Sequence, residues 1–205
     1  MKKALLLVCI LAISVATTAC INNLAVQELN NKAAAFMEKE NYPEAIERLK
    51  SSIDLDDSLF ESHYNLAIAY TKNNDYISAV ESYKKAIQLN PDFAEAYYSL
   101  AVTEENIITD IYSGILRVDE TGNISKVNAE DIPVEANSSD EEFVHKNEFT
   151  LDDNARTYIN KTMSDAVKNY ETYIEKGTDI PDRSEVEARV NELKTTLEDL
   201  ERTAE

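Results

Sequence analysis

Small and apolar residues in the first half of the chain recur at a constant step of 34 positions. Ala45 and Ala79 form one pair with this step, and Ala33, Ala67 and Ala101 form a longer series. Larger side chains keep the same step in four further pairs: Tyr42 and Tyr76, Leu49 and Tyr83, Ile53 and Ile87, and Leu55 and Leu89. A constant step of this length is typical of stacked helix–turn–helix units. The pattern predicts an all-α fold in which each unit buries its apolar face against the next.

The clearest unit covers residues 60–93. Its first helix is expected to carry a large residue, a leucine, a small residue and an aromatic residue on one face, and its second helix carries two alanines around an aromatic residue. These positions are His63, Leu66, Ala67 and Tyr70, followed by Ala79, Tyr83 and Ala86. Alanine at a helix crossing lets two backbones approach closely, and aromatic side chains fill the space beside it.

The segment HYNLAIAYTKNNDYISAVESYKKAIQLNP, which ends at Pro91, resembles a tetratricopeptide repeat. Residues 26–59 match the pattern more loosely, with Lys32 and Ser52 where the family has leucine and alanine. A third unit begins at residue 94. The resemblance implies a right-handed solenoid of about three repeats, which binds other proteins and does not itself catalyse a reaction.

The third unit is divided by a long insertion over residues 106–160. Its first helix is expected over 94–105 and its second over 161–177. In the second helix, Ala166, Tyr170, Tyr173 and Ile174 repeat the spacing of Ala79, Tyr83, Ala86 and Ile87. Apolar residues on both flanks of the insertion keep a helical period, so both helices are expected to continue into it and to pack as an antiparallel pair. The upstream set is Leu100, Ile107, Ile108, Ile111 and Ile115, and the downstream set is Ala155, Tyr158, Ile159, Thr162, Met163 and Ala166.

The centre of the insertion, residues 116–151, is acidic and poor in apolar residues. Alternating apolar positions within residues 115–127 predict a small β-hairpin. The stretch 135–142 has the composition of a disordered segment. Asp152 or Asp153 is expected to cap the returning helix.

A last amphipathic helix is expected over residues 184–201. Gly177 ends the helix before it, and Ser184 with Glu187 has the spacing of a capping box. Its apolar residues step by four and three positions: Val186, Val190, Leu193, Leu197 and Leu200. We expect this helix to cover the last open face of the stack; a seam with a partner helix or a second copy is the alternative.

The formal charge of the chain is −19, from 39 acidic and 20 basic residues among 205. This balance argues against a nucleic-acid partner, whose phosphates need a basic face, and against an electrostatic hold on anionic lipid. Acidity of this kind ordinarily serves solubility, and a basic partner is the alternative. The two histidines, His63 and His145, stand apart in the sequence, and we find no phosphate loop, metal-ligand spacing or nucleophile–base set. The sequence therefore predicts a protein that is not an enzyme and has no cofactor or metal.

The first residues have the features of a secretory leader. Two lysines at positions 2 and 3 precede an apolar run over residues 4–16, which is too short to span a bilayer. Residues 17–20, Thr-Thr-Ala-Cys, resemble the lipobox of bacterial lipoproteins, with Thr17 where leucine is usual.

The lipobox resemblance implies that residues 1–19 are a signal peptide and that Cys20 carries the acyl chains of a membrane anchor. The only other cysteine, Cys9, lies within the leader, so Cys20 has no disulfide partner in the mature chain. A plain secretory signal cut before Cys20 is the alternative. Residues 20–25 then link the anchor to the repeat domain, 26–205, on the extracytoplasmic side of the bacterial envelope, which is the periplasmic face of the outer membrane in a Gram-negative cell.

In tetratricopeptide repeats the first helix of each unit lines a concave surface. The residues expected to point there are Asn30, Asn31 and Ala34 in the first unit, Tyr64, Asn65, Ile68 and Lys72 in the second, and Tyr98, Ser99, Val102 and Glu105 in the third. From these we predict a partner-binding groove made of Asn31, Tyr64, Asn65, Ile68, Tyr98, Ser99 and Val102. Packing of Tyr64 and Tyr98 against neighbouring helices is the alternative. Asn30, Glu95 and Ser99 stand where some repeats of this family have the cations that grip a terminal carboxylate, so an acidic tail is not the expected ligand.

The leader, the repeats and the absence of a catalytic set together predict a lipid-anchored envelope scaffold. Its partner would be another envelope protein or peptide, bound in the concave groove, and the acyl chains on Cys20 would hold the scaffold in the membrane. An accessory ligand-binding component of an envelope transport system is the alternative.

Overall fold

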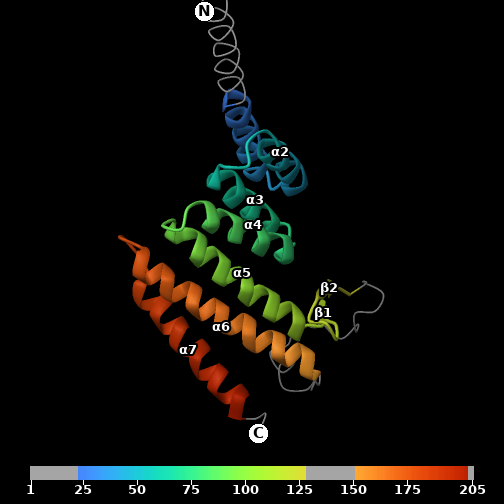
Figure 1. Ribbon diagram of the computed structural model, residues 1–205, viewed down its shortest axis with the longest axis vertical. Helices are drawn as coiled ribbons and strands as arrows, with labels where there is room; N and C mark the ends of the chain where they lie inside the picture. Colours follow the sequence, from blue (N-terminus) through green and yellow to red (C-terminus); the bar gives the residue numbers. More distant parts are fainter. Residues whose placement is uncertain (1–22, 128–150, 203–205) are drawn as a thin grey trace, which may run out of the picture. The chain divides into compact units, whose positions relative to one another are not determined.

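A computed structural model describes residues 23–127 and 151–202 (Figure 1). The chain forms two compact units, the first ending at Pro91 and the second beginning at Asp92. Among the described residues, the secondary structure is helical except for two short strands. The predicted leader with Cys20, the stretch 135–142 and His145 lie outside the described residues.

The described residues of the first unit, 23–91, form four helices. The first covers residues 23–37 and is followed by α2, Tyr42–Leu55; the second pair is α3, Phe60–Lys72, and α4, Tyr76–Leu89. The connections within each pair are only a few residues long, so the two helices of a pair run antiparallel. The sequence prediction of helix–turn–helix units is therefore confirmed for this half of the chain.

The two tight turns of the first unit repeat the 34-residue step in their backbone geometry. Glu40 has φ 57° and Asn74 has φ 55°, so both turns place one residue in the left-handed region. The next residue in each turn closes the same hydrogen bond, from Asn41 N to Phe36 O and from Asp75 N to Tyr70 O, both at 2.9 Å. This is the six-to-one bond that ends a helix at a left-handed residue.

The small residues of the pattern lie at the centre of the first unit. One cluster of buried side chains joins the first helix, α2 and α3: Ala33, Ala45, Ile46, Leu49, Leu66 and Ala69. Phe36, Met37, Ile53 and Tyr70 pack against its border. Ala67 of α3 and Ala79 of α4 are also fully buried, because a methyl side chain at the crossing leaves room for the opposite backbone.

The described residues of the second unit form three long helices, which lie side by side in Figure 1: α5, Ala94–Tyr112; α6, Asp153–Lys176; and α7, Arg183–Arg202. α5 and α6 are antiparallel and extend beyond the length of a repeat helix, as the apolar periodicity predicted. The side chains that seal this pair are Leu100, Ile107, Ile108 and Ile111 on α5 and Ala155, Ile159, Thr162, Met163 and Ala166 on α6. Ile115, which the sequence placed on the same face, is instead 37% exposed, because α5 ends before it in a turn at Gly114 with φ 70°.

A two-stranded hairpin follows α5, as predicted. β1, Leu116–Val118, pairs antiparallel with β2, Ile124–Lys126, and Val118 faces Ile124. Asp119 holds the loop by accepting hydrogen bonds from the Thr121 hydroxyl at 2.6 Å and the Asn123 backbone N–H at 3.0 Å. These bonds lower the pKa of the Asp119 carboxyl to about 2.

Two of the predicted helix ends are confirmed and one is wrong. Asp152 caps α6 by accepting a hydrogen bond from Ala155 N at 2.7 Å. α6 ends before Gly177, where a Cβ would lie 2.9 Å from the carbonyl oxygen of Tyr173. The capping box of Ser184 is not formed: α7 begins at Arg183, and the Asp182 carbonyl already accepts from Val186 N at 3.1 Å. Ser184 therefore lies inside the first turn of the helix.

The apolar face of α7 packs on the other helices of the second unit, as expected. Val186, Val190 and Leu193 are buried, and Leu197 and Leu200 are half-buried. None of the helices described is both long enough and apolar enough to cross a membrane.

Candidate functional site

The first unit exposes part of the surface predicted to form its share of the groove. Asn31 on the first helix is exposed, whereas Tyr64, Asn65 and Ile68 on α3 are half-buried. The Tyr64 ring packs on Tyr83 of α4 with the ring centroids 5.7 Å apart. This contact orients the Tyr64 ring and restricts its motion.

Asn30, which the sequence placed on the groove side, points into the core of the first unit instead. Its Nδ2 group donates to the hydroxyls of Ser52 on α2 and Ser62 on α3, each at 3.1 Å. Both serines are fully buried. Ser52 occupies a position where the repeat pattern has alanine, and Asn30 satisfies the hydroxyl that the substitution brings into the core.

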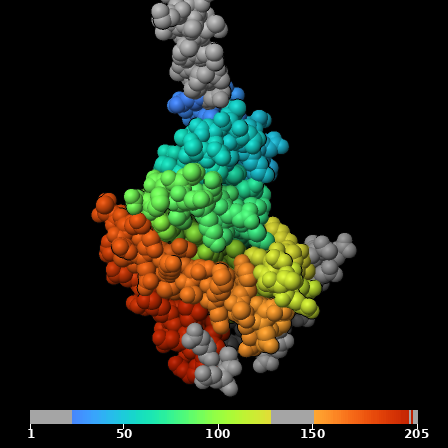
Figure 2. Space-filling view, viewed as in Figure 1, coloured from blue at the N-terminus to red at the C-terminus, as the bar shows by residue number. Residues whose placement is uncertain are grey.

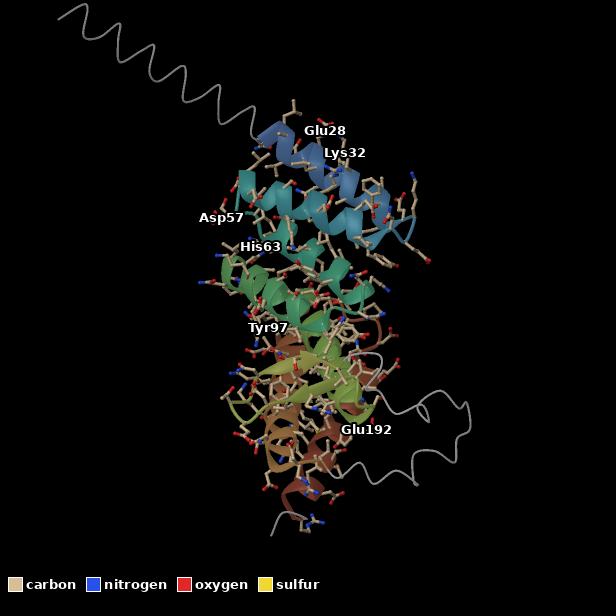
Figure 3. All side chains as sticks on the ribbon, turned by 90° about the vertical axis from the view of Figure 1, so that its right-hand side faces the viewer. Glu28, Lys32, Asp57, His63, Tyr97 and Glu192 are labelled. Atoms are coloured by element: carbon tan, nitrogen blue, oxygen red, sulfur yellow. The ribbon has the colours of Figure 1, made fainter. Side chains whose placement is uncertain are left out.

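His63 has a structural contact. Its ring is buried, and its Nε2 atom lies 3.1 Å from the backbone carbonyl oxygen of Asp57 (Figure 3). The contact ties α3 to the connection before it. Among the described residues, no group of three or more histidine, cysteine, aspartate or glutamate side chains is placed to hold a metal ion.

The second unit contains a cluster of three tyrosine rings. Tyr98 of α5 lies 5.7 Å from Tyr170 and 5.1 Å from Tyr173 of α6, measured between ring centroids. The first pair has an edge-to-face arrangement, which aromatic rings favour. Tyr170 is buried, but Tyr98 remains 40% exposed. Tyr98 thus packs against a neighbouring helix and also presents part of its ring to solvent.

An ionic network joins the three helices beside these rings. Glu105 of α5 accepts a hydrogen bond from the Tyr170 hydroxyl at 2.6 Å and pairs with Arg189 of α7, whose Nε lies 2.8 Å from Oε2. Arg189 also donates to Glu192 at 2.6 Å. Glu105 is therefore held by contacts with two other helices. The sequence had placed it among the residues that point to the concave surface, but its carboxylate is already bound within the chain.

Tyr98, Tyr170, Arg189 and Glu192 border a groove of about 500 Å³ on the second unit. This volume lies within the range of ligand pockets. Its lining comes from all three helices and the turn before α7: Tyr98, Tyr170, Asp182, Glu185, Val186, Ala188, Arg189 and Glu192. Ser99 and Val102, also predicted for the groove, are half-buried on α5 and do not line it. Figure 2 shows α6 and α7 as adjacent bands of the second unit.

Sequence reasoning did not identify the α7 side of this groove. Glu185, Arg189 and Glu192 are spaced by four and three positions, so they share one stripe of α7, and Asp182 continues this spacing into the turn before the helix. This helix was expected to cover the last open face of the stack, with a seam to a partner helix or a second copy as the alternative. The spacing of its charges was visible in the sequence, but nothing there indicated that the stripe faces Tyr98.

Burial raises the pKa of the Tyr170 hydroxyl above its ordinary value, and the hydrogen bond to Glu105 raises it further. The folded protein therefore holds this proton more tightly than the unfolded chain does. The stabilisation is fully present below about pH 10, the ordinary tyrosine value, and is lost as the pH rises above it.

We expect the free energy of unfolding to fall above pH 10 and the variant Tyr170→Phe to lose less of it. Above pH 10, the free energy of unfolding of the phenylalanine variant should fall less steeply with pH, by about 1 kcal/mol per pH unit. At neutral pH the variant should be about 1 kcal/mol less stable, because the hydrogen bond is lost. Burial also raises the pKa of Tyr158 and Tyr173, so some slope should remain. Urea denaturation between pH 8 and 11 measures it; equal slopes in both proteins would contradict the assignment.

Comparisons with known proteins agree with this architecture. The model of the tetratricopeptide repeat family matches residues 60–93, and a second TPR repeat model matches residues 33–74. No curated protein sequence matches the chain.

Three solved structures illustrate the likeness in fold. The first TPR of Spaghetti (RPAP3), bound to the HSP90 peptide SRMEEVD, is 15% identical with a TM-score of 0.54, covering 85% of this chain and 94% of that one. The Sgt2 TPR domain from Aspergillus fumigatus is 15% identical with a TM-score of 0.53, over 88% and 83%. The TPR2B domain of yeast Sti1, in its pHsp70 complex, is 12% identical with a TM-score of 0.51, over 86% and 98%. At these identities the likeness concerns the fold alone.

Proposed function

The chain carries tetratricopeptide repeats, and we propose on this premise that it is a lipid-anchored scaffold of the bacterial cell envelope. The observation that carries the binding role is the groove of the second unit, where an exposed aromatic ring is fixed between helices. Tyr98 is held by two tyrosine contacts, so little side-chain entropy is lost when a partner packs on it. A rigid, partly exposed tyrosine is typical of residues that dominate binding energy.

The fold is generally a protein-interaction module without catalytic activity, and the proposed role needs no chemistry. Solved relatives in fold include domains bound to HSP90 and HSP70 peptides. A protein or peptide segment is accordingly the class of partner that we propose. Asn30 and Ser99 are uncharged and Glu95 is acidic, so these positions supply no cation for an acidic tail.

Replacing Tyr64 and Tyr98 together by alanine is expected to weaken partner binding about tenfold, since each loses an aromatic contact surface. The measurement is chemical cross-linking in intact membranes followed by purification of the protein with its partners. Tyr112→Ala is the matched control, because Tyr112 is also exposed, at 45%, but belongs neither to the predicted groove set, which contains Tyr64, nor to the groove lining, which contains Tyr98. Recovery of the same partners with the double variant would refute a role for the tyrosines.

The proposed anchor rests on the resemblance of residues 17–20 to a lipobox. Cys20→Ser is expected to release the protein from the membrane fraction, because serine cannot carry the thioether-linked lipid and a protein without its acyl chains has no firm hold. Cys9→Ser is the matched control and should leave the protein in membranes. Both variants are compared by membrane fractionation and by detection of incorporated radioactive fatty acid. A Cys20→Ser protein that keeps its lipid would refute the proposed anchor.

A further inference from the structure

The groove of the second unit is lined mainly by negative charge. Asp182, Glu185 and Glu192 contribute carboxylates, and Arg189 contributes the one guanidinium among the lining residues. Neither Asp182 nor Glu185 forms an ion pair with any described residue. Neither carboxylate is therefore already engaged in an ion pair that a ligand would have to break.

The positive charge of Arg189 is already committed. Its guanidinium pairs with Glu105 on one side and donates to Glu192 at 2.6 Å on the other. The hydrogen bond to Glu105 raises the pKa of Arg189 above its ordinary value, so the arginine stays charged and bound. An anionic ligand in this groove would have to compete with two carboxylates for one guanidinium, which makes an acidic segment a poor occupant.

The aromatic side of the groove provides a second, independent feature. The π-face of a tyrosine attracts a cation through its quadrupole, and the Tyr98 ring is exposed to the groove while its contacts with Tyr170 and Tyr173 fix its position. A cation placed there would meet the ring together with the nearby carboxylates. A neutral apolar segment could use only the ring and the small apolar part of the lining, Val186 and Ala188.

We propose that the groove binds a partner segment through an arginine or lysine side chain, whose cation lies against Tyr98 and is paired by Asp182 and Glu185. This inference rests on the proposed binding function and names the chemistry of the partner. The volume of about 500 Å³ suits one long side chain with its adjoining backbone. The pairing of a basic segment with an acidic groove also suits the overall charge of the chain, −19.

The test uses pools of short, end-blocked peptides in which one central position is fixed and the others are mixed. The full chain is immobilised, and retention of each pool is measured at about 0.15 M salt, where distant charges are screened. Pools with arginine or lysine fixed should be retained about fivefold more than pools with glutamine or glutamate. Tyr98→Ala should abolish most of this preference, and Tyr98→Phe, which keeps the ring, should retain it.

A charge-matched pair of variants separates the groove from the general acidity of the protein. Asp182→Asn with Glu185→Gln should lower retention of the arginine and lysine pools about threefold. Asp179→Asn with Glu198→Gln removes the same formal charge from exposed residues that do not line the groove, and should leave retention nearly unchanged. Equal losses in the two double variants would overturn the proposal.

The outcomes also distinguish this inference from the function on which it rests. If glutamine or glutamate pools are retained as well as arginine and lysine pools, and Tyr98→Ala still lowers the retention of all pools, the proposed preference for cations is wrong. The groove then remains a binding site. A preference for cations that survives both Tyr98→Ala and the Asp182→Asn/Glu185→Gln variant lies outside the groove and overturns the proposal. If no pool depends on Tyr98 and the Tyr64→Ala/Tyr98→Ala variant keeps its partners, the binding function itself fails.

Discussion

Replacing Leu49 by alanine is expected to lower the free energy of unfolding of the first unit by about 3 kcal/mol. Leu49 lies in the middle of α2, is completely buried, and belongs to the cluster that joins α2 to the first helix and α3. Truncation removes several methyl groups from this contact and leaves a cavity that the surrounding helices cannot fully close, because their alanines already bring the backbones near to contact.

Leu55→Ala is the matched control for this prediction. It is the same chemical change at the last residue of the same helix, where the side chain is 42% exposed, and it should cost about 0.5 kcal/mol or less. Native-state hydrogen exchange of the α2 and α3 amides measures both variants and reports on this unit specifically. Similar losses for the two variants would mean that the cluster around Leu49 is not the core of the unit.

Glu105→Ala is expected to lower the free energy of unfolding of the second unit by about 2 kcal/mol. Its carboxylate is the point where the three helices meet: it accepts from the Tyr170 hydroxyl of α6 and pairs with Arg189 of α7. The side chain is only 16% exposed, so water cannot fully replace these bonds. The alanine variant leaves the buried Tyr170 hydroxyl without its acceptor and leaves Arg189 paired with Glu192 alone.

Two further variants test which part of the network matters. Glu105→Gln keeps an oxygen that can accept from Tyr170 but removes the charge opposite Arg189, so we expect about half of the loss. Glu192→Ala removes the outer partner of Arg189, whose side chain is 64% exposed, and should cost less than about 0.5 kcal/mol. Hydrogen exchange of the α6 and α7 amides provides the measurement. A larger effect at Glu192 than at Glu105 would contradict the assigned roles.

Local patterns predicted much of the fold. Alanine and aromatic residues at fixed spacing indicated the helices of the first unit, and the apolar period on both sides of the insertion indicated the length of α5 and α6. The alternation before Val127 indicated the hairpin. Each of these is a property of one segment, because a helix or strand places its own side chains on faces whose spacing is set by the backbone.

The errors arose where a residue's role depends on another segment. Asn30 was placed on the groove by its position on the helix, but two serines from α2 and α3 draw it into the core. Ser184 had the spacing of a cap, yet the helix begins one residue earlier. Ile115 fitted the helical period, but the turn at Gly114 ends the helix before that period can continue.

The sequence by itself determined that this protein is built of helix–turn–helix repeats and that α5 and α6 extend into a long insertion, because these features follow from periodicity within each segment. Only the tertiary structure decided what surrounds the groove. Glu105 and Arg189 are 84 positions apart, and Tyr98 meets rings of α6 across the whole insertion. The packing of α7 brings a stripe of carboxylates beside Tyr98 and commits the nearby arginine to partners within the chain. Such pairings depend on how helices pack after they have formed, and the periodicity of one helix holds no information about the charges on another.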